Sequence, residues 1–248
     1  MNKPFVIAPQ IQYLSSIPEI GIDDSSYQYN GTTVPRVTHI LSEMLHEDSL
    51  MSWSNYIGLY KHQKYNEVLK RAADIGTYVH NAIEKKILQN KTLDENEIPL
   101  YLRPEVISAY TAFCSWWDII TSQNYEVIYS EETLICPYYG GTLDLLIKIN
   151  GRIYLVDFKT SNHVGYKYYL QLAAYRRSLA TERNIHIDGC IILRLSKSGS
   201  IFEEYIVDLH KPEDAMFMHQ CDQAFLSLVT AYFYRHCVIE TSKTYLMR

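Results

Sequence analysis

The sequence predicts an α/β fold, with a mixed central sheet flanked by helices and a helical N-terminal half. Within residues 139–175, two apolar runs are separated by Asn150-Gly151, a dipeptide that is typical of the tight turn in an antiparallel hairpin. Over about 64–89, apolar residues recur every three or four positions, which is the period of an amphipathic helix. Helices and strands on both sides of the hairpin fit one domain that spans residues 1–248.

The N-terminal part, residues 1–124, is expected to be an irregular arm followed by helices. Residues 1–31 fit either a short hairpin or an ordered arm. The elements expected after them are a loop entering a short helix at 34–45, helices at about 48–60, 64–89 and 102–122, and a loop at 91–99. The apolar stripe of the 64–89 helix comprises Leu69, Ala72, Ala73, Gly76, Val79, Ile83 and Ile87. Trp116 and Trp117 are expected to anchor the core rather than to stack on bases.

The C-terminal part, residues 125–248, is expected to hold the sheet. Its expected elements are a strand at 125–135, the hairpin, a helix at about 165–181, strands at 189–196 and 201–209, and a helix at about 212–238. In the second strand of the hairpin, Leu155, Asp157 and Lys159 fall on one face by the two-residue period. Both faces are apolar until Asp157, so this strand is expected to be central in the sheet.

Composition and charge narrow the class of protein. With 47% hydrophobic and 21% charged residues, the chain is typical of a soluble globular protein. No apolar run approaches the roughly 20 residues that a membrane span needs, and no secretory segment is recognised. We therefore expect a cytoplasmic protein without a membrane partner, in a phage or bacterial setting. The net charge of −5 argues against a protein that coats nucleic acid, but it permits a local nucleic-acid groove.

Cysteine and tyrosine usage adds two expectations. The five cysteines contain no C-x-x-C pair, so free thiols in a reducing compartment are expected. An iron–sulfur cluster, which requires four suitably spaced cysteines, is not expected. The 22 tyrosines are an excess; most are expected to serve packing, whereas exposed ones can stack on unpaired bases.

Asp144, Asp157 and Lys159 place charge at one end of the expected hairpin. Buried charges are costly unless they are paired or bound to a metal. Oxygen ligands from the two carboxylates and from the Phe158 backbone carbonyl suit Mg²⁺ or Mn²⁺. Such a metal lowers the pKa of a bound water and polarises a phosphoryl oxygen. Lys159, on the same face as Asp157, can orient that water or neutralise charge in the transition state.

A structural ion pair between Asp157 and Lys159 is the competing interpretation, because ion pairs of this kind are common at strand ends. For these two residues alone the structural interpretation is favoured. Asp144 after a Gly-Gly pair, together with Gln171 and Tyr175 one helical turn apart, favours a functional site instead.

Three segments together resemble the PD-(D/E)XK nuclease superfamily, in particular its RecB-like exonuclease branch. The segments GGTLD, VDFKTS and QLAAY are similar to the G-x-x-D, D-x-K and Q-x-x-x-Y motifs of that branch. The resemblance implies a restriction-endonuclease-like form of the α/β fold. It also implies that Asp144 and Asp157 are metal ligands, that Lys159 is the catalytic lysine, and that Gln171 and Tyr175 shape the site and contact the DNA backbone.

Two further segments extend the resemblance toward the N-terminus. VPRVTHILSEML, residues 34–45, is similar to a V-P-S-V-T-x-I-L segment of phage and mitochondrial genome maintenance exonucleases, with Arg36 at the usual serine. This similarity implies that Arg36 and Thr38 lie beside the substrate strand. IGTYVH matches the G-T-x-x-H motif and implies that His80 is a metal ligand or an orienting partner. From the residues alone, His80 fits a partly buried packing position, and Glu84 fits either a surface residue or a support of the site.

Other charged residues leave alternatives open. The family often has an acidic residue just before the G-x-x-D strand, and both Glu131 and Glu132 fit this position loosely. Lys167, Arg176 and Arg177 on the 165–181 helix are compatible with a solvated face or with phosphate contacts, each of which would add salt dependence to binding.

The function that the resemblance implies is a metal-dependent DNA exonuclease, acting on single-stranded or frayed ends in DNA repair or recombination. One alternative is an endonuclease of the same superfamily, which would also cut a closed circle. Another is a non-catalytic nucleic-acid-binding module on the same fold. A third is a structural protein in which Asp157 and Lys159 form only an ion pair, whose thermal stability would not respond to Mn²⁺.

Overall fold

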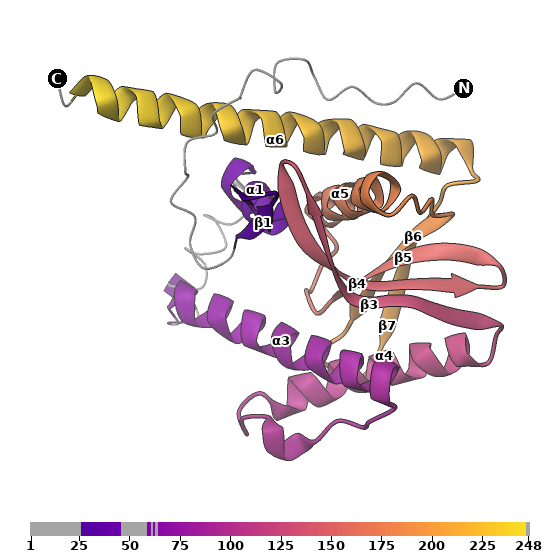
Figure 1. The fold of residues 1–248 in the computed structure, drawn as a ribbon. Helices are drawn as coiled ribbons and strands as arrows, with labels where there is room; N and C mark the ends of the chain where they lie inside the picture. Colours follow the sequence, from indigo (N-terminus) through magenta and orange to yellow (C-terminus); the bar gives the residue numbers. More distant parts are fainter. Residues whose placement is uncertain (1–25, 46–58, 61, 63, 247–248) are drawn as a thin grey trace.

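The fold is seen in a computed structural model that describes residues 26–45, 59–60, 62 and 64–246. The helix expected at about 48–60 therefore lies almost wholly outside the described residues. The described part is α/β, with a five-stranded mixed sheet flanked by helices and a mainly helical N-terminal part (Figure 1). The predicted fold class is confirmed at this level. None of the described helices combines the length and apolar character that crossing a membrane requires.

The sheet has the strand order β3-β4-β5-β6-β7, so the strand predicted to be central occupies the middle position. Its members are β3 (Tyr125–Cys136), β4 (Tyr139–Ile149), β5 (Arg152–Lys159), β6 (Gly189–Leu195) and β7 (Phe202–Asp208). The pairs β3–β4, β4–β5 and β6–β7 are antiparallel, and β5–β6 is parallel. A parallel neighbour requires a crossover, and the helix α5 (Tyr166–Glu182) supplies it.

Helices cover both faces of this sheet (Figure 1). On one face lie α1 (Val37–Met44), α5 and α6 (Pro212–Leu246); on the other lie α3 (Tyr65–Gln89) and α4 (Arg103–Thr121). A short 3₁₀ turn at Glu95–Glu97 connects α3 to α4. The strands β1 (Tyr27–Tyr29) and β2 (Thr32–Val34) form a separate small hairpin that contacts β3 and β4.

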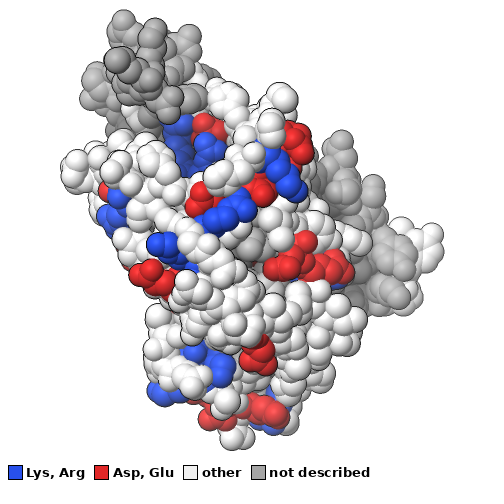
Figure 2. Space-filling model, turned by 90° about the vertical axis from the view of Figure 1, so that its right-hand side faces the viewer, with Lys and Arg blue, Asp and Glu red and all other residues white. Residues whose placement is uncertain are grey.

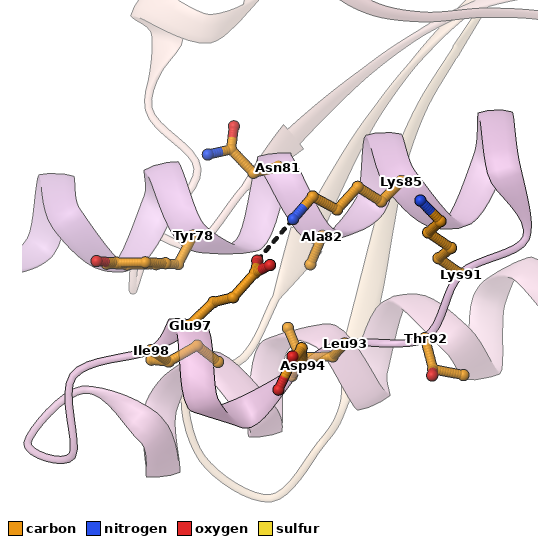
Figure 3. Close-up of a pocket in the computed structure, with 10 residues that line it drawn as sticks. All are labelled: Tyr78, Asn81, Ala82, Lys85, Lys91, Thr92, Leu93, Asp94, Glu97 and Ile98. Carbon is orange, nitrogen blue, oxygen red and sulfur yellow. Dashed lines mark hydrogen bonds and ion pairs between the residues drawn. The ribbon is translucent and has the colours of Figure 1, made fainter.

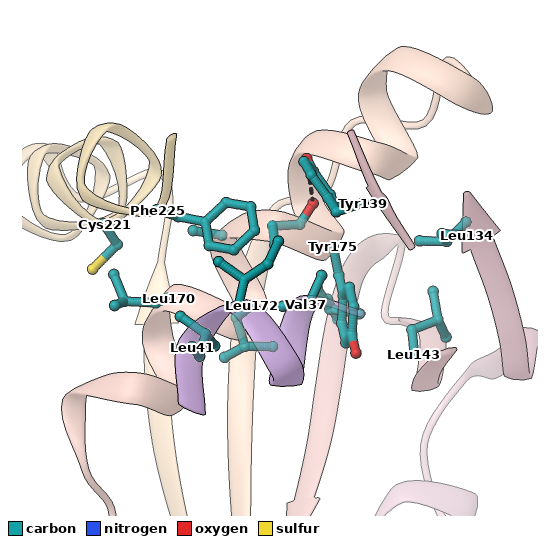
Figure 4. Packing of buried hydrophobic residues seen from close by; sticks show 14 of the residues in the cluster. Val37, Leu41, Leu134, Tyr139, Leu143, Leu170, Leu172, Tyr175, Cys221 and Phe225 are labelled. Carbon is teal, nitrogen blue, oxygen red and sulfur yellow. Dashed lines mark hydrogen bonds between the residues drawn. The ribbon is translucent and has the colours of Figure 1, made fainter. Parts of the chain in front are cut away.

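Two hydrophobic cores stabilise the two layers. The core under α1, α5 and α6 includes Leu143, Leu172 and Phe225, part of which is shown in Figure 4. The core under α3 and α4 includes Phe113, Trp116 and Trp117, so the two tryptophans are core anchors as predicted. Burial of such aromatic rings is the main favourable contribution to this layer.

The β3–β4 hairpin changes face along its length. Leu145 packs into the α3–α4 core, whereas Leu143, two residues earlier, packs into the α5–α6 core. Residues two apart on a regular strand share a face, so the strand turns over at Asp144. Opposite this point, Glu131 has a φ of 52°, in the left-handed region, between the pairs Ser130–Leu145 and Glu132–Leu143. The distal part of the hairpin consequently rises from the sheet toward α6 (Figure 1).

Two expectations need correction. The helical period predicts that Leu69, Ala72 and Ala73 are buried in α3, but all three are exposed. The buried residues of this helix are Ile75, Val79, Ala82 and Ile83. The C-terminal helix was expected to end at about 238, whereas α6 continues to Leu246. The prediction was wrong for these residues because the first half of α3 contacts α4 through the polar side chain of Arg71, which pairs with Glu105 at 2.6 Å, and its apolar residues before Ile75 are not buried.

Candidate active site

The candidate site lies where β4 separates from β5. Their pairing ends at Leu145–Val156, so Asp144 and Asp157 would form the next pair in the register. The antiparallel hairpin therefore brings the two aspartates to the same end, as predicted. Strand β5 continues alone beside β6 as far as Lys159. This divergence opens space at the sheet for side chains from α3 and β3.

His80 from α3, Glu131 from β3 and Asp144 from β4 converge at this point and are called the His80 cluster here. Their ligand atoms all lie within 4.8 Å of one another. His80 Nδ1 lies 3.5 Å from Asp144 Oδ1 and 3.8 Å from Glu131 Oε1. His80 Nε2 lies 3.1 Å from the Phe158 carbonyl oxygen. That contact with a carbonyl requires Nε2 to donate, so Nδ1 is the nitrogen that faces the carboxylates.

Asp144 is fixed by the backbone of the neighbouring strand. Its Oδ2 accepts a hydrogen bond of 2.7 Å from the Phe158 amide, and the residue is 8% exposed. Burial opposes ionisation, but His80 and Lys159 together with this hydrogen bond lower the pKa of Asp144. Asp144 is therefore held as a carboxylate with Oδ1 directed at His80.

Asp157 and Lys159 form a buried pair beside the cluster. Lys159 Nζ lies 2.7 Å from Asp157 Oδ1 and 2.6 Å from Oδ2, and its charge also lies over the Tyr168 ring, 4.9 Å from the centroid. Despite the short distance, Asp157 Oδ2 makes no hydrogen bond of acceptable geometry within the described part of the chain. The charge of this oxygen is therefore offset by the Lys159 ammonium, but without a well-directed hydrogen bond.

The charges in the site are strongly interdependent. Burial alone lowers the pKa of His80, but Asp144 and Glu131 outweigh burial and raise that pKa to about 10. Burial raises the pKa of Glu131, and burial with the nearby charge of Asp144 raises the pKa of Asp157 to about 6 despite Lys159. Burial opposes the charge of Lys159, yet Asp157 and Asp144 raise its pKa. Without a bound cation, His80 and Lys159 are thus the internal counterions of the carboxylates.

The donor set fits a divalent metal ion. One imidazole nitrogen and two carboxylates already converge, and Asp157 Oδ2 is a further buried carboxylate oxygen, which in this structure contacts only the Lys159 ammonium among the described residues. Carboxylates suit Mg²⁺ and Mn²⁺, and a nitrogen in the set favours Mn²⁺, since Mg²⁺ prefers oxygen ligands and keeps its waters. The Phe158 carbonyl, expected to be a ligand, accepts the His80 hydrogen bond and retains a second lone pair.

Gln171 and Tyr175 come to the site from α5, as the helical spacing predicts. Both are buried, and Gln171 Nε2 lies 3.4 Å from the Tyr175 hydroxyl. Burial raises the pKa of Tyr175, and the charges of Asp144 and Asp157 add to the effect, so the ring stays neutral beside them. The close approach requires Gly141, because a Cβ there would lie 2.5 Å from the Tyr175 ring.

The small β1–β2 hairpin closes the other side of the distal hairpin. A Cβ at Gly140 would lie 2.5 Å from the Tyr27 ring, whose hydroxyl lies 3.1 Å from Thr142 Oγ1. Arg36 lies over the same ring at 5.5 Å from its centroid. Arg36 and Thr38 are exposed.

Several predicted residues lie apart from the cluster. The structure distinguishes the two glutamates: Glu131 points to His80, whereas Glu132 pairs with Arg183 at 2.8 Å. Glu84 makes no direct contact with the ligand atoms among the described residues, although its charge acts on Glu131. Arg177 of α5 forms an ion pair of 3.0 Å with Asp222 of α6, so its charge is neutralised between the two helices.

The remaining basic residues are dispersed. Lys167, in the first turn of α5, and Arg176, farther along it, are half-buried. On the face that Figure 2 shows, basic and acidic side chains are interspersed and no extended patch of one sign is present.

Two residues at the site were not predicted. Tyr168 covers the Lys159 ammonium, and Tyr27 packs on Gly140. The Y-x-x-Q spacing of Tyr168 and Gln171, one helical turn apart, is a signal that could have identified the first. A separate pocket of about 380 Å³ lies on the side of α3 turned away from His80, where Lys85 pairs with Glu97 at 2.6 Å (Figure 3). Cys114, Cys136, Cys190 and Cys221 are free thiols.

Comparisons with known proteins complete the description. No protein-family model matches the chain. A search of curated proteins also finds no match. Among solved structures, the crystal structure of SSO0001 aligns with 62% of this chain and 74% of its own, at 14% sequence identity and a TM-score of 0.29.

Proposed function

We propose that the protein is a metal-dependent DNA nuclease of the PD-(D/E)XK superfamily, acting as an exonuclease on single-stranded or frayed ends. The observation that carries this proposal is the convergence of the His80 cluster with the Asp157–Lys159 pair at one strand end. Four elements distant in the sequence supply these five residues. A structural ion pair needs only the last two, and it does not require His80, Glu131 and Asp144 to converge beside it.

The chain's own residues have separable roles in phosphodiester hydrolysis. His80, Glu131, Asp144 and Asp157 would hold a divalent cation, which when bound supplies Lewis acidity toward a phosphate and a water. Lys159 lies against Asp157 and can donate a hydrogen bond to a phosphate oxygen or to the attacking water. The Nε2 of His80 is held by the Phe158 carbonyl, which fixes the ring so that Nδ1 faces the carboxylates.

Residues of α5 line the side from which a strand can approach. Gln171 and Tyr175 provide an amide and a hydroxyl close to the aspartates. Tyr168 presents a half-buried ring over Lys159. An aromatic ring beside a cationic group suits an unpaired base and its phosphate, which supports a single-stranded or frayed substrate.

The test compares end-labelled linear single-stranded DNA with a circular single-stranded control, in Mn²⁺, Mg²⁺ or EDTA. The variants are Lys159→Ala and, as the matched control, Lys85→Ala, which also removes a lysine paired to a glutamate but lies on the other side of α3. We expect metal-dependent loss of the linear strand only. Lys159→Ala should reduce the rate by about 100- to 1000-fold, and Lys85→Ala should leave it unchanged.

The other outcomes are equally informative. Cutting of the circle would replace the exonuclease by an endonuclease of the same superfamily. Metal-dependent stabilisation with no cutting of linear or circular single strands, duplex DNA or RNA would indicate a binding module. Absence of both cutting and metal-dependent stabilisation would contradict the proposal.

A further inference from the structure

A second cavity, called the α5–α6 cavity here, lies between the C-terminal half of α5, the loop at 183–188 and the first turns of α6. Its volume is about 560 Å³, within the range of pockets that hold small organic ligands. Ile185, Ile187 and Leu209 give it an apolar lining. It uses a different face of α5 from the one that carries Gln171 and Tyr175, so it is distinct from the candidate active site.

The polar lining of this cavity is mainly basic. Arg176, Arg177, His186 and His219 line it together with one acidic residue, Asp222. Asp222 is already neutralised, because it pairs with Arg177 at 3.0 Å and both side chains are largely buried. Arg176 has no hydrogen bond or ion pair among the described residues, so its guanidinium is available to a ligand. His186 and His219 lie at the rim, where both residues are exposed.

The rim of the cavity is held in place by the backbone. The Ile185 amide donates to the Leu179 carbonyl at 3.0 Å, which ties the loop to the end of α5. The Leu209 amide donates to the Asp188 carbonyl at 2.9 Å, which ties the same loop to the connection before α6. His210 Nε2 adds a contact of 2.8 Å to Asp188 Oδ1. A cavity fixed in this way can bind without a large ordering cost.

We propose that the α5–α6 cavity binds a nucleotide, with the phosphate at Arg176 and the imidazoles and the base against the apolar lining. A guanidinium matches a phosphate through two parallel hydrogen bonds, which favours this anion over a single point charge. The apolar residues account for the organic part of the ligand, which inorganic phosphate lacks. The phosphate ester can be that of a free nucleotide or of the phosphorylated end of a strand, and the two sources are separable by experiment.

The test measures binding calorimetrically on the full chain in EDTA, so that metal does not recruit ligands to the His80 cluster. The probes are deoxyadenosine monophosphate, deoxyadenosine, inorganic phosphate, and a short oligonucleotide with a 5′-phosphate, a 3′-phosphate or neither. Arg176→Gln should weaken binding of the monophosphate by about tenfold or more. The matched control is Arg183→Gln, since Arg183 borders the same loop but pairs with Glu132 outside the cavity.

A second variant protects the test against a folding defect in Arg176→Gln. Ala180→Phe fills the cavity from α5 and should abolish binding while the melting temperature stays near that of the wild type. Preference for the phosphorylated oligonucleotides over the monophosphate would identify a strand end as the source. Failure of every probe to bind, or equal binding in wild type and Arg176→Gln, would overturn the proposal. So would binding lost in Lys159→Ala but retained in Arg176→Gln. None of these results depends on nuclease activity.

Discussion

Carboxylate side chains lie at both ends of the β4–β5 hairpin, but their surroundings shift their pKa values differently at the two ends. At the turn end, Asp188 receives hydrogen bonds from the Ile153 amide and from His210, and Asp208 pairs with Arg152. These partners lower the pKa of both aspartates. At the other end, burial raises the pKa of Asp157 and of Glu131, and only Asp144, which faces His80, has a lowered pKa.

The difference separates structural carboxylates from carboxylates that await a ligand. At the turn end every carboxylate oxygen has a partner in the chain, and the groups are near solvent. At the site end the carboxylates are crowded and buried, and Asp157 Oδ2 has no hydrogen bond among the described residues. Mutations at the two ends should therefore have different effects on activity.

The largest effect is expected for Asp157→Asn. If the proposed function is correct, this change removes a ligand oxygen and its charge, so the rate of DNA cleavage should fall by about 100- to 1000-fold. The metal-free protein should lose melting temperature, because Asn leaves the Lys159 ammonium without its carboxylate partner, but it should remain folded at the temperature of the cleavage assay. Cleavage assays and thermal melts in EDTA measure the two quantities. A variant that is active, or inactive only because it is unfolded, would remove the distinction between the ends.

A second effect concerns pH. The protonated form of His80 is favoured in the metal-free fold, so its stabilising contribution is complete below its ordinary pKa and is lost as the pH rises toward about 10. Metal binding must displace that proton. The increase in melting temperature caused by Mn²⁺ should therefore grow between about pH 6 and pH 8. His80→Ala should flatten this dependence, and a wild-type increase that is constant or declines with pH would contradict the assignment.

Tyr168 offers a smaller and more specific effect. Tyr168→Leu removes the ring over Lys159 and should reduce kcat by about fivefold, the size of a partly desolvated cation–π contact. Tyr168→Phe keeps the ring and should restore the rate. If both variants behave alike, the hydroxyl rather than the ring matters. If KM alone changes, Tyr168 contacts the strand and does not position Lys159.

The smallest effect is expected at the turn end. Asp188→Ala removes the partners of the Ile153 amide and of His210, at a site close to solvent. The free energy of unfolding should fall by about 1 kcal/mol, and cleavage should be unchanged. Urea unfolding and the cleavage assay provide the readouts. Loss of cleavage without loss of stability would mean that the two ends are coupled through β5.

The parts of the fold set by local sequence were predictable. Asn150-Gly151 adopts positive φ at both positions, which explains why this dipeptide located the hairpin turn. The turn then determines the register, and the register places Asp144 opposite Asp157. The helical period of α5 likewise brings Gln171 and Tyr175 to one side. Short-range geometry was sufficient in these cases.

Features that depend on long-range packing were not predictable. The choice between Glu131 and Glu132 follows from the turn of the β3 strand, which no local propensity signals. From the sequence alone, Arg177 fits a solvent-exposed basic residue. In the structure it pairs with Asp222, which is 45 residues away along the chain. In α3 the buried residues begin only at Ile75, and the helical period alone cannot show that an apolar stripe is only partly covered.

Glu131 combines a side chain that the cluster uses with a backbone that suits glycine. Its left-handed φ of 52° costs a residue with a Cβ about 1 kcal/mol or more. Replacement by glycine would relax the strand and discard the carboxylate. Selection for thermal stability and selection for catalysis therefore favour different residues at position 131. A library sorted only for heat resistance should drift toward glycine there, whereas one sorted for DNA cleavage should retain glutamate.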